Sequence, residues 1–336
     1  MSNILVYDVA AESGGALSIL IDFYRKAESD VENQYYFVVS IPELESTENI
    51  SVIRCPWVKK SWFHRLYMDN WVSKHIIYKY HINKIISLQN HTLTNCQAMQ
   101  CVYVHNALPY SDYRFRLIDQ PYLWFYQNVI GRYTAHSLKR ADEIIVQTKW
   151  MKRKIMLETG KDKNIRVEPV ESTLFSDQVL LHTWSNVFFY PATAFAFKNH
   201  QVIIDASKLL SKEKIKDYEI VFTISGDENE YSRRIKKQIA DNSLPIKLVG
   251  HLNKNNMASY YQRSCLVFSS FIETVGLPLL EAKKFNAPII AADCDYAHEA
   301  INEYSFAMYF DFDDAERLSQ LMKSMLNQIG GNCYES

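Results

Sequence analysis

Hydrophobic positions along the chain form short uninterrupted runs, which are separated by longer stretches where apolar residues recur every three or four positions. Uninterrupted apolar runs are typical of strands in a parallel sheet that is covered on both faces. The longer stretches have the spacing of amphipathic helices, at 17–27, 122–139, 202–210, 231–240 and 257–263. The runs that predict strands are 4–9, 35–41, 50–55, 84–88, 101–105, 143–148, 187–190, 219–225, 246–249, 265–269, 288–292 and 307–310.

This alternation of strands and helices predicts a doubly wound α/β architecture with parallel sheets. The series starts twice, first with "NILVYDV" and again with "NVFFYPA", after an irregular patch at 168–186. We therefore expect two Rossmann-like domains, at 1–172 and 173–336, with the patch as their linker. Two such domains would face each other across a cleft, where ligands of these folds bind.

Composition excludes several classes of protein. The chain has 336 residues, of which 48% are hydrophobic and 22% charged, and its formal net charge is −1. A near-neutral globular protein has no general attraction for nucleic acid, so we expect no such partner. The six cysteines form no C-x-x-C pair, which is typical of a reduced protein without structural zinc. We expect a cytoplasmic location, because the N-terminus lacks a basic signal region and no apolar run approaches the ~18 residues of a membrane span.

The stretch "FIETVGLPLLE", residues 271–281, follows a predicted strand and contains a helix start. Its proline fits the first turn of a helix, and Gly276 lets the backbone come close to a ligand. The N–H groups around Gly276 and Leu277 would bind an anion such as phosphate at the positive end of the helix dipole. Glu273 and Glu281 would flank that anion and accept hydrogen bonds from sugar hydroxyls. Alternatively, both are acids that only stabilise the helix N-terminus.

The same stretch, followed by "NAPIIAAD", resembles the C-terminal signature of glycosyltransferase family 4, whose members are retaining enzymes of GT-B fold. The E-x7-E motif of the family matches at Glu273 and Glu281. "YPATAFAFKNHQVIIDA" is similar to the segment that opens the second domain of the family. "ISLQN", "CVYVHNALPY" and "ADEIIVQTKWMKRKI" are similar to elements of the first domain, so the resemblance covers most of the chain. It implies that the N-terminal domain, 1–172, binds the acceptor and that the C-terminal domain, 173–336, binds the nucleotide-sugar donor.

The resemblance implies a role for three residues. Glu273 would hold hydroxyls of the donor sugar, Glu281 would hold the ribose of the nucleotide, and Lys198 would neutralise the leaving diphosphate. Members often carry an arginine about five residues before this lysine, where the present chain has Thr193. The phosphate site would then lack one cation unless Lys254 or another base replaces it. We expect this difference to lower donor affinity or activity.

Neither a metal nor a cofactor is expected. No D-x-D motif stands where a metal-dependent transferase would carry it. Residues 293–295, "DCD", have that spacing but end a predicted strand in the C-terminal half. The nucleotide diphosphate sugar would be a co-substrate.

Four residues of the first domain are further candidates for ligand binding. Gly14 and Gly15 follow the first strand, where similar enzymes place a glycine-rich loop near the donor phosphates and the acceptor; alternatively, they form a tight turn. His105 matches the cleft histidine of the family, which would contact the donor sugar; alternatively, it is hydrogen-bonded within the sheet edge. Asn90, which ends "ISLQN", is a cleft candidate of the same kind.

Residues 54–84 carry seven Lys or Arg and one acid, Asp69, interleaved with aromatic residues. A basic and aromatic amphipathic helix suits an anionic membrane surface. Many similar enzymes act on lipid-linked acceptors at the inner leaflet, so we expect peripheral contact there. Alternatively, the aromatic side chains belong to the core and the bases form a solvated face.

The sequence therefore predicts a metal-independent, retaining glycosyltransferase. It would move a hexose-type sugar from a nucleotide diphosphate sugar to a glycan or lipid-linked acceptor in bacterial surface polysaccharide synthesis. A nucleotide-sugar epimerase of similar fold and a catalytically inactive nucleotide-sugar binding protein are the alternatives. An oxidoreductase is not favoured, because no G-x-G-x-x-G follows a strand.

Overall fold

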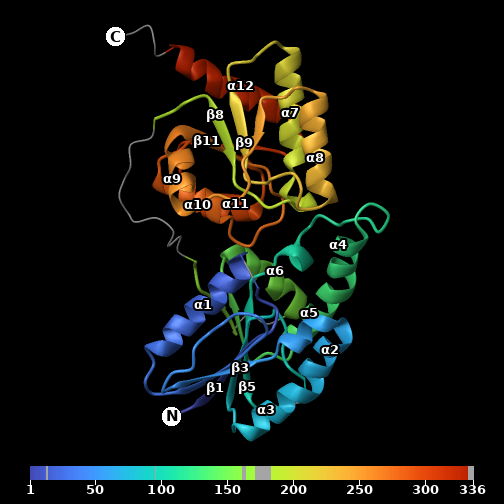
Figure 1. Cartoon of the computed structure of the whole chain (residues 1–336), viewed down its shortest axis with the longest axis vertical. Coiled ribbons are helices and arrows are strands. Elements are labelled where there is room, and N and C mark those ends of the chain that lie inside the picture. The colour runs from blue at the N-terminus through green and yellow to red at the C-terminus, as the bar shows by residue number, and fades with distance from the viewer. Residues whose placement is uncertain (13, 95, 161–163, 171–182, 332–336) are drawn as a thin grey trace. The chain divides into compact units, whose positions relative to one another are not determined.

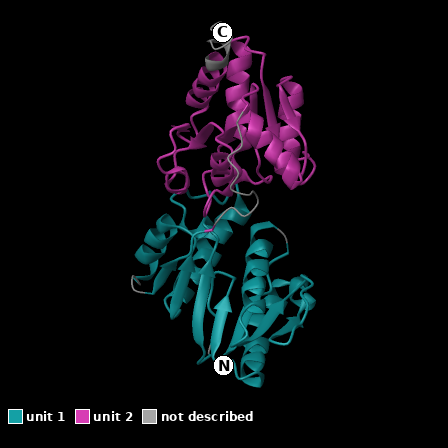
Figure 2. Ribbon diagram, turned by 90° about the vertical axis from the view of Figure 1, so that its left-hand side faces the viewer, with its two compact units in different colours: residues 1–169 teal, residues 170–336 magenta. Residues whose placement is uncertain are grey.

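The structure is a computed structural model that describes residues 1–12, 14–94, 96–160, 164–170 and 183–331. The chain divides into two compact units, Met1–Pro169 (unit 1) and Val170–Ser336 (unit 2), as Figure 1 and Figure 2 show. The expected domain boundary after residue 172 falls outside the described residues. The same is true of most of the expected linker, because 171–182 are not described.

Unit 1 is built on a seven-stranded parallel sheet with the order β3-β2-β1-β4-β5-β6-β7. The order reverses between β1 and β4, where Leu5 lies opposite Ile85. Loops that leave the carboxyl ends of these two strands run in opposite directions, which opens a space for ligands. The strands are β1 (Asn3–Asp8), β2 (Gln34–Val39), β3 (Ile50–Arg54), β4 (Lys84–Ser87), β5 (Met99–Val104), β6 (Glu143–Val146) and β7 (Ile165–Val167).

Helices cover both faces of this sheet, because successive side chains of a strand point to opposite faces. Leu5 and Tyr7 pack into one hydrophobic cluster together with Met68, whereas Val6 packs into the other together with Leu20. The helices are α1 (Gly14–Glu28), α2 (Trp62–Tyr67), α3 (Ser73–Lys79), α4 (Pro121–Phe125), α5 (Gly131–Leu138) and α6 (Lys149–Thr159). Shorter turns are η1 (Pro56–Lys60) and η3 (Leu108–Tyr110), and the π-helical turns are η2 (Met68–Val72) and η4 (Tyr126–Ile130).

Unit 2 repeats the same arrangement on a six-stranded parallel sheet with the order β10-β9-β8-β11-β12-β13, which reverses between β8 and β11. Its strands are β8 (Val187–Tyr190), β9 (Glu219–Phe222), β10 (Ile246–Leu248), β11 (Ser264–Phe268), β12 (Ile289–Ala292) and β13 (Ala307–Phe310). Its helices are η5 (Ala196–Lys198), α7 (His200–Lys212), α8 (Glu230–Asp241), α9 (Lys254–Arg263), α10 (Leu277–Lys284), α11 (Asp295–Ile301) and α12 (Ala315–Gly331). In Figure 1, α7 and α8 lie on one side of the sheet and α10 and α11 on the other.

The predicted fold class is confirmed, since both units are doubly wound parallel sheets and every run predicted as a strand forms one. The sequence missed β7, whose three residues include the exposed Arg166 and therefore show no apolar run. The helix predicted at 122–139 begins at Pro121 and contains the π turn η4, which its hydrophobic spacing did not indicate.

Candidate active site

The loops that follow β8 and β11 meet at the carboxyl edge of the unit 2 sheet, because these two strands are neighbours. The amide of Phe271 donates to the carbonyl oxygen of Phe197 over 3.0 Å. The Ser269 hydroxyl lies 3.0 Å from the carbonyl oxygen of Asn199 and 3.1 Å from that of Lys198. These bonds join two segments that are 70 or more residues apart in sequence, so the fold fixes the positions of the side chains they carry.

Lys198 and Glu273 are brought together by this joint. The Lys198 ammonium group forms a hydrogen-bonded ion pair with the Glu273 carboxylate, and only 17% of each side chain is exposed. The hydroxyl of the buried Tyr190, at the end of β8, donates to the Lys198 carbonyl oxygen and fixes the backbone beneath the lysine. A charged pair with little solvent around it is strongly coupled, because the surrounding medium screens it poorly.

Gly276 directly precedes α10 and has the left-handed conformation, with φ 74° and ψ 54°. A Cβ atom there would lie 3.0 Å from Leu279 Cδ1 and 3.1 Å from the ring of Tyr296, so this position requires glycine for its space as well as its conformation. Leu277, the first residue of α10, is partly exposed. The backbone therefore enters the helix as the sequence predicted, with the proline in the first turn.

Glu281 lies on the buried side of α10. Its exposure is 3%, and its Oε2 accepts a hydrogen bond of 2.6 Å from the hydroxyl of the fully buried Tyr261. Burial raises the pKa of this carboxyl group, an effect that the Tyr261 hydrogen bond opposes. The two glutamates of the E-x7-E motif therefore have different surroundings: Glu273 pairs with a cation at the sheet edge, and Glu281 with a buried phenol. The expected ribose contact of Glu281 stays a prediction.

The sequence also missed His200, which begins α7 two residues after Lys198. Its imidazole is fully buried and lies 4.9 Å from the ring of Tyr190. Burial, together with the nearby Lys198 charge, lowers its pKa to about 3, so the ring is neutral and adds no cation to the phosphate site. Thr193, which stands where an arginine was expected, is exposed.

The "DCD" segment places Asp293 next to His298, with 2.6 Å between Oδ1 and Nε2. Within the described part of the chain, no three His, Cys, Asp or Glu side chains gather closely enough to hold a metal ion. Metal independence stays a prediction.

In unit 1, Asn90 and His105 lie together at the carboxyl edge of the sheet. The Asn90 Oδ1 accepts hydrogen bonds from the amides of His105 (2.8 Å) and Asn106 (3.1 Å), with Asn90 in the left-handed conformation at φ 62°. The His105 Nε2 lies 2.8 Å from the carbonyl oxygen of Leu88, which can only accept, so Nε2 carries a proton. Burial lowers the pKa of His105, which makes the imidazole neutral. Asn90 thus positions the loop that carries His105.

Gly14 and Gly15 begin α1 and are both exposed. Gly14 has φ 62°, and a Cβ atom at either glycine would meet nothing within 4 Å. The structure therefore places the glycines beside open space at the end of β1, which neither proves nor contradicts their predicted contact with a ligand.

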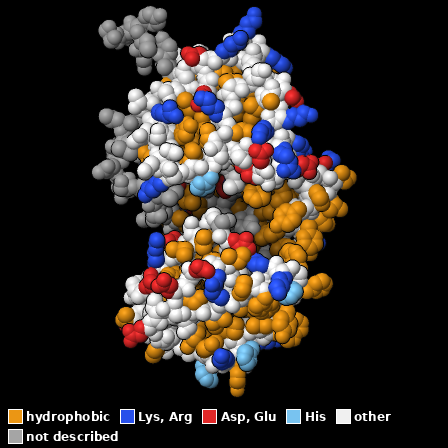
Figure 3. All heavy atoms as spheres, in the orientation of Figure 1, with side chains coloured by type: hydrophobic (Ala, Val, Ile, Leu, Met, Phe, Trp, Pro, Cys, Tyr) orange, Lys and Arg blue, Asp and Glu red, His pale blue; other side chains and the backbone are white. Residues whose placement is uncertain are grey.

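The basic and aromatic stretch 54–84 divides between core and surface. Trp57 packs against the cluster that contains Met68, whereas other aromatic side chains of the stretch are exposed. Figure 3 shows hydrophobic side chains gathered on the side of unit 1 formed by α2 and α4. No helix in the described residues has the length and apolar character needed to cross a membrane. The exposed aromatic residues on α2, η2, α3 and α4 are Trp62, Phe63, Tyr67, Trp71, Tyr78, Tyr122 and Phe125.

Comparison with known proteins agrees with this architecture. Residues 173–329 match the family model described as glycosyl transferases group 1. The chain is 23% identical over 298 residues to the O-antigen chain mannosyltransferase RfbU of Salmonella typhimurium strain LT2, a match that covers 86% of this chain and 76% of that protein.

Among solved structures, the sucrose-phosphate synthase of Thermosynechococcus elongatus is similar with a TM-score of 0.73 at 15% identity, covering 97% of this chain and 90% of that one. Anabaena Alr3699/HepE in complex with UDP-glucose is similar with a TM-score of 0.67 at 14% identity, covering 98% and 91%. These structures support the fold, and the family model supplies the sequence pattern of the second unit. Residues 173–329 are thus similar to glycosyl transferases group 1, and the solved structures share the fold of the whole chain.

Proposed function

We propose that this chain transfers a hexose-type sugar from a nucleotide diphosphate sugar to a glycan or lipid-linked acceptor, with retention of configuration and without a metal. The observation that supports this best is the ion pair between Lys198 and Glu273 beside the start of α10. It offers a cation for a diphosphate and a carboxylate for sugar hydroxyls at one edge of a sheet whose sequence matches the group 1 family model.

The pair suits a site that binds a charged leaving group. A bound diphosphate would give the Lys198 ammonium a second anionic partner, while Glu273 would turn its free lone pairs to hydroxyl groups of the donor sugar. N–H groups at the start of α10, near Gly276 and Leu277, would bind phosphate oxygens at the positive end of the helix dipole. Negative charge grows on the diphosphate as the glycosidic bond breaks, so these groups bind the transition state more strongly than the ground state.

The proposed transfer needs no protein nucleophile. The acceptor oxygen forms its bond to the anomeric carbon on the face from which the diphosphate departs. The proton of the acceptor hydroxyl passes to the departing phosphate oxygen, and the nucleoside diphosphate leaves with the electron pair of the broken bond. Retention and the identity of the sugar are expectations from the family resemblance, as is the sugar contact predicted for His105.

Substitution of the ion pair tests the assignment. Lys198→Ala and Glu273→Gln should each lower kcat/KM by roughly 10²–10³-fold, the cost of removing a group that stabilises transition-state charge. Lys208→Ala is the matched control, because Lys208 belongs to α7 and also pairs with an acid, Asp205, at 2.9 Å. Its turnover should equal that of the wild type. Undiminished turnover in both site variants, with circular dichroism confirming that they are folded, would refute the assignment.

Product analysis separates the alternative functions. Proton NMR of the donor with the full chain should show no change of the sugar until an acceptor is added, and the product should keep the anomeric configuration of the donor. Conversion of the sugar without an acceptor would indicate an epimerase. Binding of the donor with no release of nucleoside diphosphate would indicate an inactive binding protein, an outcome consistent with Thr193 in place of the expected arginine.

We infer a place of action from the surface of unit 1. Its exposed aromatic residues on α2 and α4, together with Lys59, Lys60 and Lys74, which lie near α2 in the sequence, suit the inner leaflet of a bacterial membrane, where a lipid-linked acceptor would be presented. The similarity to an O-antigen chain mannosyltransferase supports a role in bacterial surface polysaccharide synthesis.

A further inference from the structure

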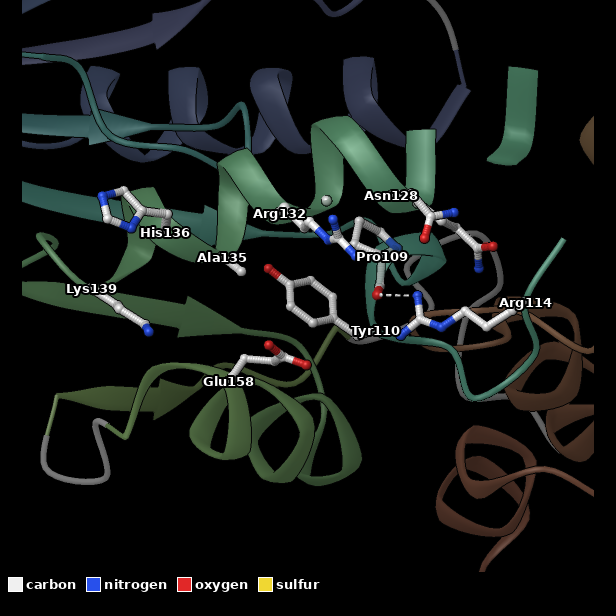
Figure 4. Close-up of a pocket in the computed structure, with 11 residues that line it drawn as sticks. Pro109, Tyr110, Arg114, Asn128, Arg132, Ala135, His136, Lys139 and Glu158 are labelled. Carbon is white, nitrogen blue, oxygen red and sulfur yellow. Dashed lines mark hydrogen bonds between the residues drawn. The ribbon is translucent and has the colours of Figure 1, made fainter. Parts of the chain in front are cut away.

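The basic side chains of the two units differ in how their surroundings hold them. In unit 1, Arg114 and Lys139 are among the residues that line a cavity of about 390 Å³. Figure 4 shows Arg114 at one end of this cavity and Lys139 at the other, so these two cations do not meet at one point. In unit 2, by contrast, Lys198 is held both by Glu273 and by the ring of Phe197.

The loop between β8 and α7, which carries Lys198, has an anchored backbone. The side chain of Asn229, at the N-cap of α8, donates to the carbonyl oxygen of Ala194 over 2.7 Å. Three positions later, the carbonyl oxygen of Phe197 accepts from the amide of Phe271, as described above. These bonds fix the part of the loop from which two phenylalanine rings project.

The two phenylalanine rings of the loop form a stack. The ring centroids of Phe195 and Phe197 lie 5.4 Å apart, with an angle of 8° between the ring planes. This distance lies in the favourable range for an offset aromatic pair. Phe195 is 49% exposed, so burial in the core does not account for its position. The stack leaves the Phe197 ring less room to turn away from its neighbours.

The Lys198 ammonium group contacts the second ring of this stack. Its Nζ lies 5.5 Å from the centroid of Phe197, within the ~6 Å over which the face of a ring attracts a cation. Only 17% of the lysine side chain is exposed, and a cation–π contact is stronger where little water surrounds it. A lysine side chain loses much rotamer freedom when it is fixed. The ring and Glu273 fix it in the folded protein, before a ligand binds.

Lys198 is the one charged residue in the sequence of this loop, since residues 191–199 are "PATAFAFKN". A diphosphate would therefore depend on where this single cation is held, and a cation that is already in place binds more tightly than a mobile one. We propose that the stacked rings of Phe195 and Phe197 position the Lys198 ammonium group for the diphosphate of the donor, an inference that rests on the proposed function. Phe197 is the positioning residue, and Phe195 supports its ring.

Fluorination of the Phe197 ring tests this role, because fluorine withdraws electron density from the ring face and leaves the shape of the side chain nearly unchanged. Titration calorimetry of the full chain with UDP, GDP and ADP first finds which of them binds the wild type most tightly. Phenylalanine with one, two and three ring fluorines at position 197 should then weaken its binding in steps, by about threefold to tenfold in total. A weaker ring lets the ammonium group turn into solvent in the free protein, a motion that the ligand must reverse.

Natural side chains extend the test. Phe197→Tyr keeps the face of the ring and should retain the affinity of the wild type. Phe197→Leu keeps an apolar side chain but has no ring, so it should weaken binding at least as much as three fluorines do. Equal affinity of the leucine variant and the wild type would refute the positioning role.

Two controls separate positioning from packing. In a Lys198→Met background the fluorinated ring should leave the affinity unchanged, because no cation remains to be held. Equal weakening with and without the lysine would overturn the proposal. The matched ring is Phe23 of α1 in unit 1, where the Lys26 Nζ lies 5.4 Å from the centroid. Three fluorines at Phe23 should not change the affinity, and a loss as large as that at Phe197 would also overturn the proposal.

The same titrations distinguish this inference from the proposed function. If none of the three nucleoside diphosphates binds the wild type, the donor site and the positioning role both fail. If one of them binds and Lys198→Met weakens it, while the fluorinated series has no effect, the donor site stands and the positioning role alone is refuted.

Discussion

The two units share a strand order and differ in where they place their aromatic residues. In unit 2, Tyr190, Tyr261 and Phe268 are fully buried, and the hydroxyls of the two tyrosines hold the loop and helix that carry Lys198 and Glu281. In unit 1, Trp62 and Phe63 are 62% and 82% exposed on α2. Buried aromatic residues rigidify a site, whereas exposed ones leave apolar surface for a partner. We infer that unit 2 is specialised for the small donor and unit 1 for the acceptor and the surface that presents it.

The carboxyl edges of the two sheets also differ, in the charge of the side chains that they carry. The edge in unit 2 carries the charged pair of Lys198 and Glu273, which suits a diphosphate. The edge in unit 1 carries Asn90 and the neutral His105, whose groups match uncharged hydroxyls. One architecture thus offers two chemistries, because the residues after the strands, and not the strands, decide what is bound.

The largest expected effect concerns the surface of unit 1. The triple variant Trp62→Ser, Phe63→Ser and Trp71→Ser should bind anionic phosphatidylglycerol vesicles roughly 10³-fold more weakly than the wild type. This estimate allows about 1.3 kcal/mol for each aromatic side chain that inserts in part into the interface. Flotation at low salt measures the bound fraction over a range of lipid concentrations.

Phe306→Ser is the control for this experiment, because Phe306 is a single exposed aromatic residue of unit 2, with 60% of its surface accessible. Its flotation should match that of the wild type. If the wild type does not float, or if the control loses as much binding as the triple variant, the surface is not a membrane-binding site.

The second-largest expected effect is a dependence of stability on pH. It compares the first strands of the two sheets, β1 and β8, which end in different buried residues, Asp8 and Tyr190. Burial raises the pKa of Asp8 to about 6, although the amides of Ala10 and Ala11 donate to it and lower the pKa. The folded state therefore holds the proton more tightly than the unfolded state does. The stability that this proton contributes is complete below pH ~4 and is lost as the pH rises to ~6. Tyr190 gives unit 2 no such dependence near neutral pH.

Asp8→Asn should therefore match the wild type at pH 4 and exceed its free energy of unfolding by up to about 3 kcal/mol at pH 7. The asparagine Oδ1 can still accept the two amide bonds. Urea titration followed by tryptophan fluorescence suits this test, because five of the six tryptophans lie in unit 1. Asp313→Asn, at an exposed acid of unit 2, is the control and should leave the pH profile unchanged. Equal profiles for Asp8→Asn and the wild type would contradict the prediction.

The fold could be predicted because the strands of a doubly wound sheet are buried on both faces and appear as uninterrupted apolar runs. β7 was not predicted, because an edge strand with Arg166 between two apolar residues contains no apolar run that would indicate a strand. The π turns η2 and η4 were not predicted for another reason. They change the hydrogen-bond pattern of a helix, but they change the spacing of its hydrophobic residues too little to be seen in the sequence.

The candidate site was predicted in part. The family resemblance singled out Lys198 and Glu273, but only the fold shows that they touch, since 75 residues separate them. Tyr261, the hydrogen-bond partner of Glu281, and the buried His200 were missed, because both look like ordinary helical residues in the sequence. Spacing alone also does not reveal that Glu281 lies on the buried side of α10.

The smallest effect compares two helix starts with the same backbone conformation. Gly276 directly precedes α10 and has φ 74°, and Gly14 begins α1 at φ 62°. A side chain costs about 1 kcal/mol at either position because of the left-handed conformation. At Gly276 the added Cβ would also press on Leu279 and Tyr296, both buried, whereas at Gly14 it would meet nothing within 4 Å.

Gly276→Ala should therefore lower the free energy of unfolding by about 2 kcal/mol and Gly14→Ala by about 1 kcal/mol, as measured by calorimetry of the full chain. The difference isolates the cost of packing from the cost of the backbone. It should also appear in function, since a shift at Gly276 moves the N–H groups at the start of α10 and should raise the KM for the donor. Equal losses of stability for the two variants would show that Leu279 and Tyr296 can move aside, and that the start of α10 is less rigid than its contacts indicate.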